Sequence, residues 1–125
     1  MGDPRHDLGL AAEATVAAWL TGIGWTVVGQ RVRSAAGSEV DLIALDPGQV
    51  LVGVEIRARR TLRTGTGAES IDGRRVARMG RTLATFAARC ETSHIGLRLD
   101  IVCMAPEPGI PGRWRVRRVP DIGSG

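Results

Sequence analysis

Two acidic residues stand inside apolar runs, Asp41 in VDLI and Glu55 in VGVEI. Burying an unpaired charge is costly, so each carboxylate needs a partner in the folded protein. If the two runs are neighbouring strands of a hairpin, the carboxylates lie close together. At about 4 Å they would repel by about 4 kcal/mol at an effective dielectric constant near 20. A shared proton, a nearby cationic side chain or a bound metal ion must offset that repulsion.

The carboxylate pair has two interpretations that patterning alone leaves open. Two hard oxygen ligands, completed by water, suit Mg²⁺ or Mn²⁺, and such an ion can activate water and stabilise a phosphoryl oxygen. The other interpretation is a structural carboxylate–arginine network inside the sheet, closed by Arg57. All seventeen basic residues are arginine, so any mechanism that needs a lysine side chain is excluded.

A basic cluster follows the second carboxylate. From Arg57 to Arg89 there are nine arginines and two acids, a local charge of +7 in a chain of net charge +4. Clustered positive charge beside a two-carboxylate strand favours nucleic-acid binding, and a solvated helix face is the alternative. The candidate nucleic-acid-binding residues are Arg59, Arg60, Arg63, Arg74, Arg75, Arg78 and Arg81.

The helices and strands that must position these residues are predicted in the order α-β-β-β-α-β, with a further strand at the end. This order indicates an α/β protein. Strands are predicted over Trp25–Arg33, Glu39–Asp46, Gln49–Arg59, Gly96–Met104 and Arg113–Val119. A second helix is predicted over Ser70–Arg89. The first helix should end near Gly22 and Gly24. Its apolar face is predicted from Leu10, Ala14, Ala17, Ala18 and Leu20, with Glu13 on the other face.

Alternation along the two central strands predicts which side chains share a face. Glu39 and Asp41 fall on one face of the earlier strand, and Val40 and Leu42 fall on the other. On the later strand Glu55, Arg57 and Arg59 share a face, opposite Val52, Val54 and Ile56. The short turn Asp46-Pro47-Gly48 predicts an antiparallel hairpin between them.

Length and composition predict a single domain over 1–125, with a core of about 8–104 and a C-terminal edge strand and tail over 105–125. The apolar fraction of 43% is enough to fill a core. No apolar run approaches the ~20 residues of a membrane span. Two cysteines and the lack of a leader-like segment lead us to expect a cytoplasmic protein without a membrane partner.

Five segments resemble the UPF0102 (YraN) family in order and spacing: LAAEATVAAWL, SEVDLIALD, VGVEIRARR, SIDGRRVARM and GLRLDIVCM. The family pattern reads GExxAxxyL, GEIDLIA, FVEVKxR, a K-x-R-R-L-like run and RFDVV. The resemblance covers about 8–104. It implies a restriction-endonuclease-like fold, with a central mixed sheet flanked by helices. It also implies a relation to archaeal Holliday-junction resolvases and a PD-(D/E)xK-type site.

The resemblance assigns roles by position. It places the metal-binding aspartate at Asp41, the second acidic ligand at Glu55 and the lysine at Arg57. Glu13 matches the acid of the first helix, an outer ligand or water-positioning group. The remaining matches to charged family positions are Glu39, Arg59 and Arg75. Gly53 and Leu99 replace family phenylalanines, which changes packing.

Arg57 in place of lysine changes the chemistry of the site. Arginine supplies charge and donors but cannot act as a base, and its fork can clamp a carboxylate and compete with a metal. The resemblance therefore implies a Mg²⁺- or Mn²⁺-dependent, structure-selective DNA endonuclease with Asp41, Glu55, Arg57 and Glu13 as catalytic residues. The alternatives are a non-catalytic nucleic-acid-binding module in which Arg57 replaces the catalytic lysine, and an adaptor that recruits a protein through its edge strand. Because related resolvases act as dimers, a homodimer also stays open.

Overall fold

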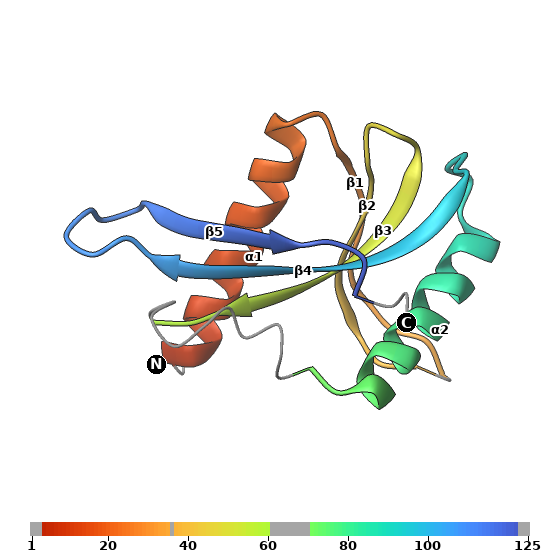
Figure 1. Ribbon diagram of the computed structural model, residues 1–125, viewed down its shortest axis with the longest axis horizontal. Coiled ribbons are helices and arrows are strands. Elements are labelled where there is room, and N and C mark those ends of the chain that lie inside the picture. Colours follow the sequence, from red (N-terminus) through yellow and green to blue (C-terminus); the bar gives the residue numbers. More distant parts are fainter. Residues whose placement is uncertain (1–3, 36, 61–70, 123–125) are drawn as a thin grey trace.

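Two helices enclose a five-stranded sheet in the computed structural model, which describes residues 4–35, 37–60 and 71–122 (Figure 1). Side chains of the first helix are described from Gly9 onward. The elements are α1 (Pro4–Gly22), β1 (Thr26–Val32), β2 (Val40–Leu45), β3 (Val50–Ala58), α2 (Gly73–Arg89), β4 (Gly96–Pro106) and β5 (Trp114–Val119). The predicted element order is confirmed, as is the fold class: an α/β, restriction-endonuclease-like arrangement around a mixed sheet.

The strands follow one another across the sheet in the order β1-β2-β3-β4-β5. β1, β2 and β3 form an antiparallel meander, and β5 pairs antiparallel with β4. β3 and β4 are parallel, because the chain crosses over through α2 before it enters β4. This topology brings the end of β3, the start of β2 and the first turns of both helices toward one end of the sheet (Figure 1).

Alternate side chains of the central strands pack on opposite helices. Leu42 and Val52 belong to the buried cluster around α1, whereas Ile43 and Leu51 belong to the cluster around α2. Successive strand residues point to opposite faces, so α1 covers one face of the sheet and α2 covers the other.

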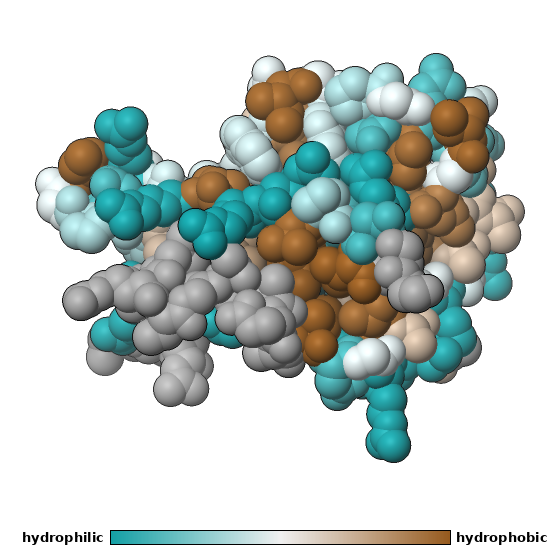
Figure 2. Space-filling view, in the orientation of Figure 1, coloured by the Kyte–Doolittle hydropathy of each residue, from teal (hydrophilic) through white to brown (hydrophobic). Residues whose placement is uncertain are grey.

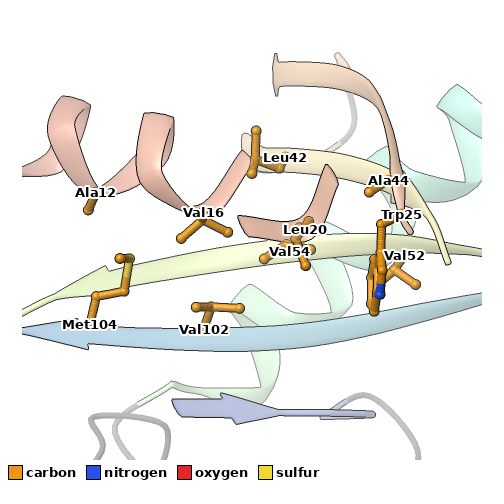
Figure 3. Packing of buried hydrophobic residues seen from close by; sticks show 10 residues of the cluster. All are labelled: Ala12, Val16, Leu20, Trp25, Leu42, Ala44, Val52, Val54, Val102 and Met104. Atoms are coloured by element: carbon orange, nitrogen blue, oxygen red, sulfur yellow. The ribbon is translucent and has the colours of Figure 1, made fainter. Parts of the chain in front are cut away.

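The buried stripe of α1 differs from the predicted one. Ala12, Val16 and Leu20, spaced by four residues, are fully buried and point toward the strands (Figure 3). The predicted positions that are exposed instead are Leu10, Ala14 and Ala18. An alanine-rich helix carries little contrast between its faces, so the spacing of small apolar residues did not identify the buried one. The helix also starts earlier than predicted, at Pro4, a residue suited to a first helical turn.

The first turn of α2 is capped by Asp72. Its carboxylate accepts hydrogen bonds from the backbone N–H groups of Arg74 and Arg75 at 2.7 and 3.0 Å, which satisfies donors that the helix itself leaves open. The predicted apolar side of α2 is confirmed, since its members all pack in the cluster under this helix: Val76, Met79, Leu83, Phe86, Ala87 and Cys90.

The last two strands form a hairpin at the edge of the sheet. β4 runs to Pro106, two residues beyond its predicted end at Met104, and β5 is the predicted C-terminal edge strand. Hydrophilic side chains cover β5 in Figure 2, while Trp114 packs against the α1 cluster. Within the described ranges, neither helix is long and apolar enough to cross a membrane.

Candidate active site

Asp41 lies where β2 separates from β3. The backbone pairs between these strands run from Leu45 opposite Leu51 to Leu42 opposite Val54 and stop there. One residue further, a carboxylate oxygen of Asp41 accepts a hydrogen bond from the Ile56 N–H at 2.8 Å. The Asp41 carboxylate thus accepts the hydrogen bond that a backbone carbonyl of β2 would accept if the β2–β3 pairing continued.

The separation of the strands overturns one predicted face. Val40 and Leu42 were expected to share a face, but Val40 packs in the α2 cluster and Leu42 in the α1 cluster. Simple alternation therefore breaks at Asp41, between them. On β3 the prediction is confirmed, since Val52, Val54 and Ile56 all pack on the α1 side.

The hairpin brings Asp41 and Glu55 together. Glu55 is buried, with 4% of its side chain exposed. Burial is the main cause that raises the pKa of Asp41 to about 7, followed by its interaction with the Glu55 carboxyl group and the repulsion from the charge of Glu55. The hydrogen bond from the Ile56 N–H acts in the opposite direction. Asp41 therefore keeps a proton well above the pH at which an exposed aspartate loses it.

Arg75, at the first turn of α2, holds the Glu55 carboxylate. Its Nε donates a hydrogen bond to Glu55 Oε2 at 2.8 Å, and this bond raises the pKa of Arg75 above its ordinary value. Arg57 Nε is 4.0 Å from the same oxygen. Arg57 thus belongs to the predicted carboxylate–arginine network at the limit of an ion pair, and Arg75 makes the shorter contact with Glu55. The capped start of α2 lies over the end of β3, which brings Arg75 to this carboxylate.

Two clefts meet at the carboxylate pair. The larger, of about 540 Å³, lies on the side of α1 and is lined by residues of α1, β1, β2 and β3, among them Glu13 and Asp41. The smaller, of about 420 Å³, is lined by Asp41, Glu55, Ile56, Arg57 and Arg75. Asp41, Ile56 and Arg57 line both clefts, so a ligand can reach Asp41 from either side.

The two other matched acids also lie in the larger cleft, each with an arginine from the β1 segment. Glu13 contacts Arg31 Nε at 3.2 Å, and its charge contributes to the raised pKa of Asp41. Glu39 contacts Arg33 Nε at 2.7 Å. The structure thus brings all four matched acidic positions to one end of the sheet.

Comparison with known proteins identifies the family of this chain. Residues 12–104 match the family described as "Uncharacterised protein family UPF0102". The chain belongs to UPF0102. It is 38% identical over 112 residues to a UPF0102 protein of Symbiobacterium thermophilum, which covers 90% of this chain and 92% of that protein. A UPF0102 protein of Bordetella avium is 40% identical over 112 residues, with 90% and 74% covered. One from Deinococcus radiodurans is 35% identical over 100 residues, with 79% and 80% covered.

In this UPF0102 protein the predicted basic residues have different surroundings. Arg59 lines the larger cleft beside Arg57, and Arg75 turns inward to Glu55 instead of lying on the solvent face of α2. Arg78 is exposed and donates to Ser38 Oγ at 2.9 Å. The other described members of the set are exposed: Arg60, Arg74 and Arg81. Arg63 lies outside the described residues.

Sequence reasoning missed the basic residues of β1 and the role of Asp100. Arg31 and Arg33 line the larger cleft with Asp41, and their alternation in QRVR was the available signal. Asp100 is fully buried in β4 and accepts hydrogen bonds from Arg98 and Arg118 at 2.8 and 2.9 Å. Its signal was an acid inside the apolar run LRLDIVCM, the same signal that identified Asp41.

The donor set of the site fits a hard divalent cation. Mg²⁺ and Mn²⁺ are bound through one or two carboxylates, with water and substrate phosphate as further ligands, and Asp41 and Glu55 supply the carboxylates. The raised pKa of Asp41 shows that positive charge beside this carboxylate is favourable. Among the residues that the structure describes, no group of three acidic, histidine or cysteine side chains could hold a metal by itself. The pair would therefore bind the ion together with solvent or phosphate oxygens.

Proposed function

We propose that this UPF0102 protein is a divalent-metal-dependent DNA endonuclease of the PD-(D/E)xK type, selective for the structure of its substrate. The proposal depends on one observation: Asp41 and the buried Glu55 line one cleft together with Arg57 and Arg75, and Asp41 also lines a second arginine-lined cleft. A divalent cation would replace the proton that Asp41 keeps and relieve the repulsion of the pair. The surrounding guanidinium groups match the geometry of phosphate oxygens.

Each residue of the pair is held by a separate donor. The Ile56 N–H holds Asp41, and Arg75 holds Glu55, so both carboxylates are oriented before a substrate arrives. Asp41 and Glu55 would hold Mg²⁺ or Mn²⁺, which supplies an activated water and a Lewis acid for the phosphoryl oxygen when bound.

The remaining residues act on the phosphate and the water. Arg57 reaches both clefts and would stabilise negative charge on the scissile phosphate, without accepting a proton. Glu13, with 15% of its side chain exposed toward the larger cleft, would position water. Three exposed arginines near the start and middle of α2, Arg74, Arg78 and Arg81, would contact the DNA backbone further from the reacting phosphate.

A cleavage assay tests the proposal. Wild-type protein should cut branched, single-stranded or duplex DNA only when Mg²⁺ or Mn²⁺ is present, and Asp41→Asn should abolish cutting while the variant stays folded. Glu107→Gln removes an acid that pairs with Arg115 on the β4–β5 hairpin, so it controls for the loss of one negative charge. Full activity of Asp41→Asn would overturn the site.

A second candidate function is a non-catalytic nucleic-acid-binding module. It is favoured by the ion pair between Arg75 and Glu55 and by the arginine at position 57, which together can substitute for a metal ion. It predicts salt-sensitive DNA binding without hydrolysis and no heat of Mn²⁺ binding in calorimetry. A Mn²⁺ titration of wild type beside Arg57→Lys separates the two functions. If only the lysine variant binds metal or cuts DNA, the binding module is the correct function.

A further inference from the structure

The larger cleft has positive residues on two walls. Arg57 and Arg59 lie at the end of β3, and Arg31 and Arg33 lie on the β1 side. β2 runs between these strands and carries Asp41. Arg57 and Arg59 of the β3 wall match family positions, whereas Arg31 and Arg33 of the β1 wall are not among the matched residues.

The strand register places Arg31 directly beside Asp41. β1 pairs with β2 through Gln30 opposite Leu42 and Val32 opposite Val40, so Arg31 is the β1 residue across from Asp41. Its backbone has a φ of 49°, a left-handed conformation that is unfavourable for a residue with a Cβ atom. A strained residue that persists at the wall of a cleft is typical of functional sites.

The ion pairs of these arginines are suited to exchange for a phosphate. Arg31 and Arg33 contact Glu13 and Glu39 through Nε, and their side chains are 52% and 77% exposed. Glu13 and Glu39 are less exposed, at 15% and 30%, but each guanidinium lies in solvent, where an ion pair contributes less to stability than in the interior, and can turn to another anion. A guanidinium has four N–H donors besides Nε–H and can bind two phosphate oxygens at once.

We propose that Arg31 and Arg33 bind backbone phosphates of the nucleic-acid strand that carries the scissile phosphate. That strand would pass through the α1-side cleft, between the β1 and β3 arginines and across Asp41. The inference rests on the proposed nucleic-acid function and adds the path of the strand. Arg31 and Arg33 would then contact phosphates close to the carboxylates, on the side of β2 opposite Arg57. Arg74, Arg78 and Arg81 of α2 would contact phosphates further away.

The test measures binding of a labelled single-stranded oligonucleotide and of its duplex by fluorescence anisotropy, in EDTA and across a salt titration. Arg31→Asn removes the guanidinium but keeps a residue that tolerates positive φ, and Arg33→Gln removes the second. Arg81→Gln samples the exposed face of α2. Arg89→Gln is the matched control, because it removes one charge at the other end of that helix.

Arg31→Asn and Arg33→Gln should each lower affinity about fivefold to eightfold at 0.1 M salt. Each should also lower the slope of log affinity against log salt by about 0.7–0.9, the contribution of one phosphate contact. Arg81→Gln should have a smaller effect, and Arg89→Gln should match wild type. Thermal melting should show that all four variants are folded.

Three outcomes would overturn the inference. If both β1 variants keep the affinity and the salt slope of the wild type, Arg31 and Arg33 do not contact phosphates. If Arg89→Gln loses as much affinity as the β1 variants, the effect comes from net charge alone. Complete competition by inorganic phosphate at the same phosphate concentration would indicate a site for a single small anion. In each of these cases the proposed nuclease function can still stand. Failure of the wild-type protein to bind any DNA would instead contradict the proposed function itself.

Discussion

At the scale of single residues, the site depends on how two carboxylates and two arginines divide their contacts. Asp41 accepts a hydrogen bond from the Ile56 N–H, and its neighbour Glu55 helps to raise its pKa, while Glu55 accepts from Arg75 at 2.8 Å. Arg57, at the position of the family lysine, is further away, at 4.0 Å from Glu55 Oε2. Arg75 therefore balances the buried charge, and Arg57 faces the clefts.

Replacing Arg75 tests how much this arginine stabilises the buried Glu55 carboxylate. Arg75→Gln leaves the buried Glu55 carboxylate without its shortest ion pair. Unfolding in urea should show a loss of about 1–2 kcal/mol, reduced because Arg75 is partly exposed. The double variant Arg75→Gln/Glu55→Gln should recover part of the loss, since it removes the charge left alone. Additive losses in the double variant would contradict the pairing.

The raised pKa of Asp41 predicts how stability depends on pH. In the unfolded chain this carboxyl group loses its proton near pH 4, but in the folded protein it keeps the proton until about pH 7. Folded protein thus binds the extra proton between these values, so stability falls as pH rises through this window and is constant above it. An asparagine side chain does not titrate, so Asp41→Asn lacks this loss. Between about pH 4 and pH 8 the free energy of unfolding of the wild type should fall by roughly 1–4 kcal/mol relative to that of the variant. Parallel stability curves for the two proteins would contradict the shifted pKa.

At the scale of elements, neighbouring strands explain two departures from the family pattern. Gly53 pairs directly with Leu99 across β3 and β4, and these positions carry phenylalanines in the family pattern. A Cβ atom on Gly53 would lie 2.8 Å from Leu99 Cδ2 and 3.3 Å from Val40 Cγ1. Glycine at position 53 therefore leaves room for the Leu99 and Val40 side chains to pack over the strand.

The buried stripe of α1 can be tested by paired substitutions. Val16→Ala removes two methyl groups from a fully buried position and should lower the free energy of unfolding by about 2 kcal/mol. Leu10→Ala removes more atoms from the predicted face, but Leu10 is 36% exposed, so its cost should be smaller. Chemical denaturation measures the free energy of unfolding of both variants. A larger loss for Leu10→Ala than for Val16→Ala would indicate that the face containing Leu10 is the buried one.

At the scale of the whole molecule, an ion network around a buried aspartate, whose members line neither cleft, ties the C-terminal segment to the sheet. Asp100 accepts from Arg98, Arg118 and the backbone N–H of Asp121. The guanidinium groups of Arg98 and Arg118 lie 5.9 and 5.5 Å from the ring centre of Trp25, within the range of cation–π contacts. One carboxylate thus joins β4, β5 and the segment after β5.

Removing this carboxylate should affect stability without affecting the site. Asp100→Asn leaves two arginines beside a buried neutral side chain and should cost about 3 kcal/mol, measured by denaturant unfolding. Glu107→Gln, which breaks an exposed ion pair on the same hairpin, should stay close to wild type. DNA affinity per folded molecule should be unchanged in both variants, and a selective loss of affinity in Asp100→Asn would place the network in the binding surface.

The sequence by itself determined the element order, the fold class and the two acids within apolar runs, because these depend on local periodicity and on the cost of charge in apolar surroundings. Only the tertiary structure decided which arginine holds Glu55, since that contact joins the first turn of α2 to the end of β3 across twenty residues. The same holds for the break in alternation at Asp41 and for the wall formed by Arg31 and Arg33. These features arise where strands separate and helix ends converge, so they depend on distances in space that a one-dimensional pattern does not contain.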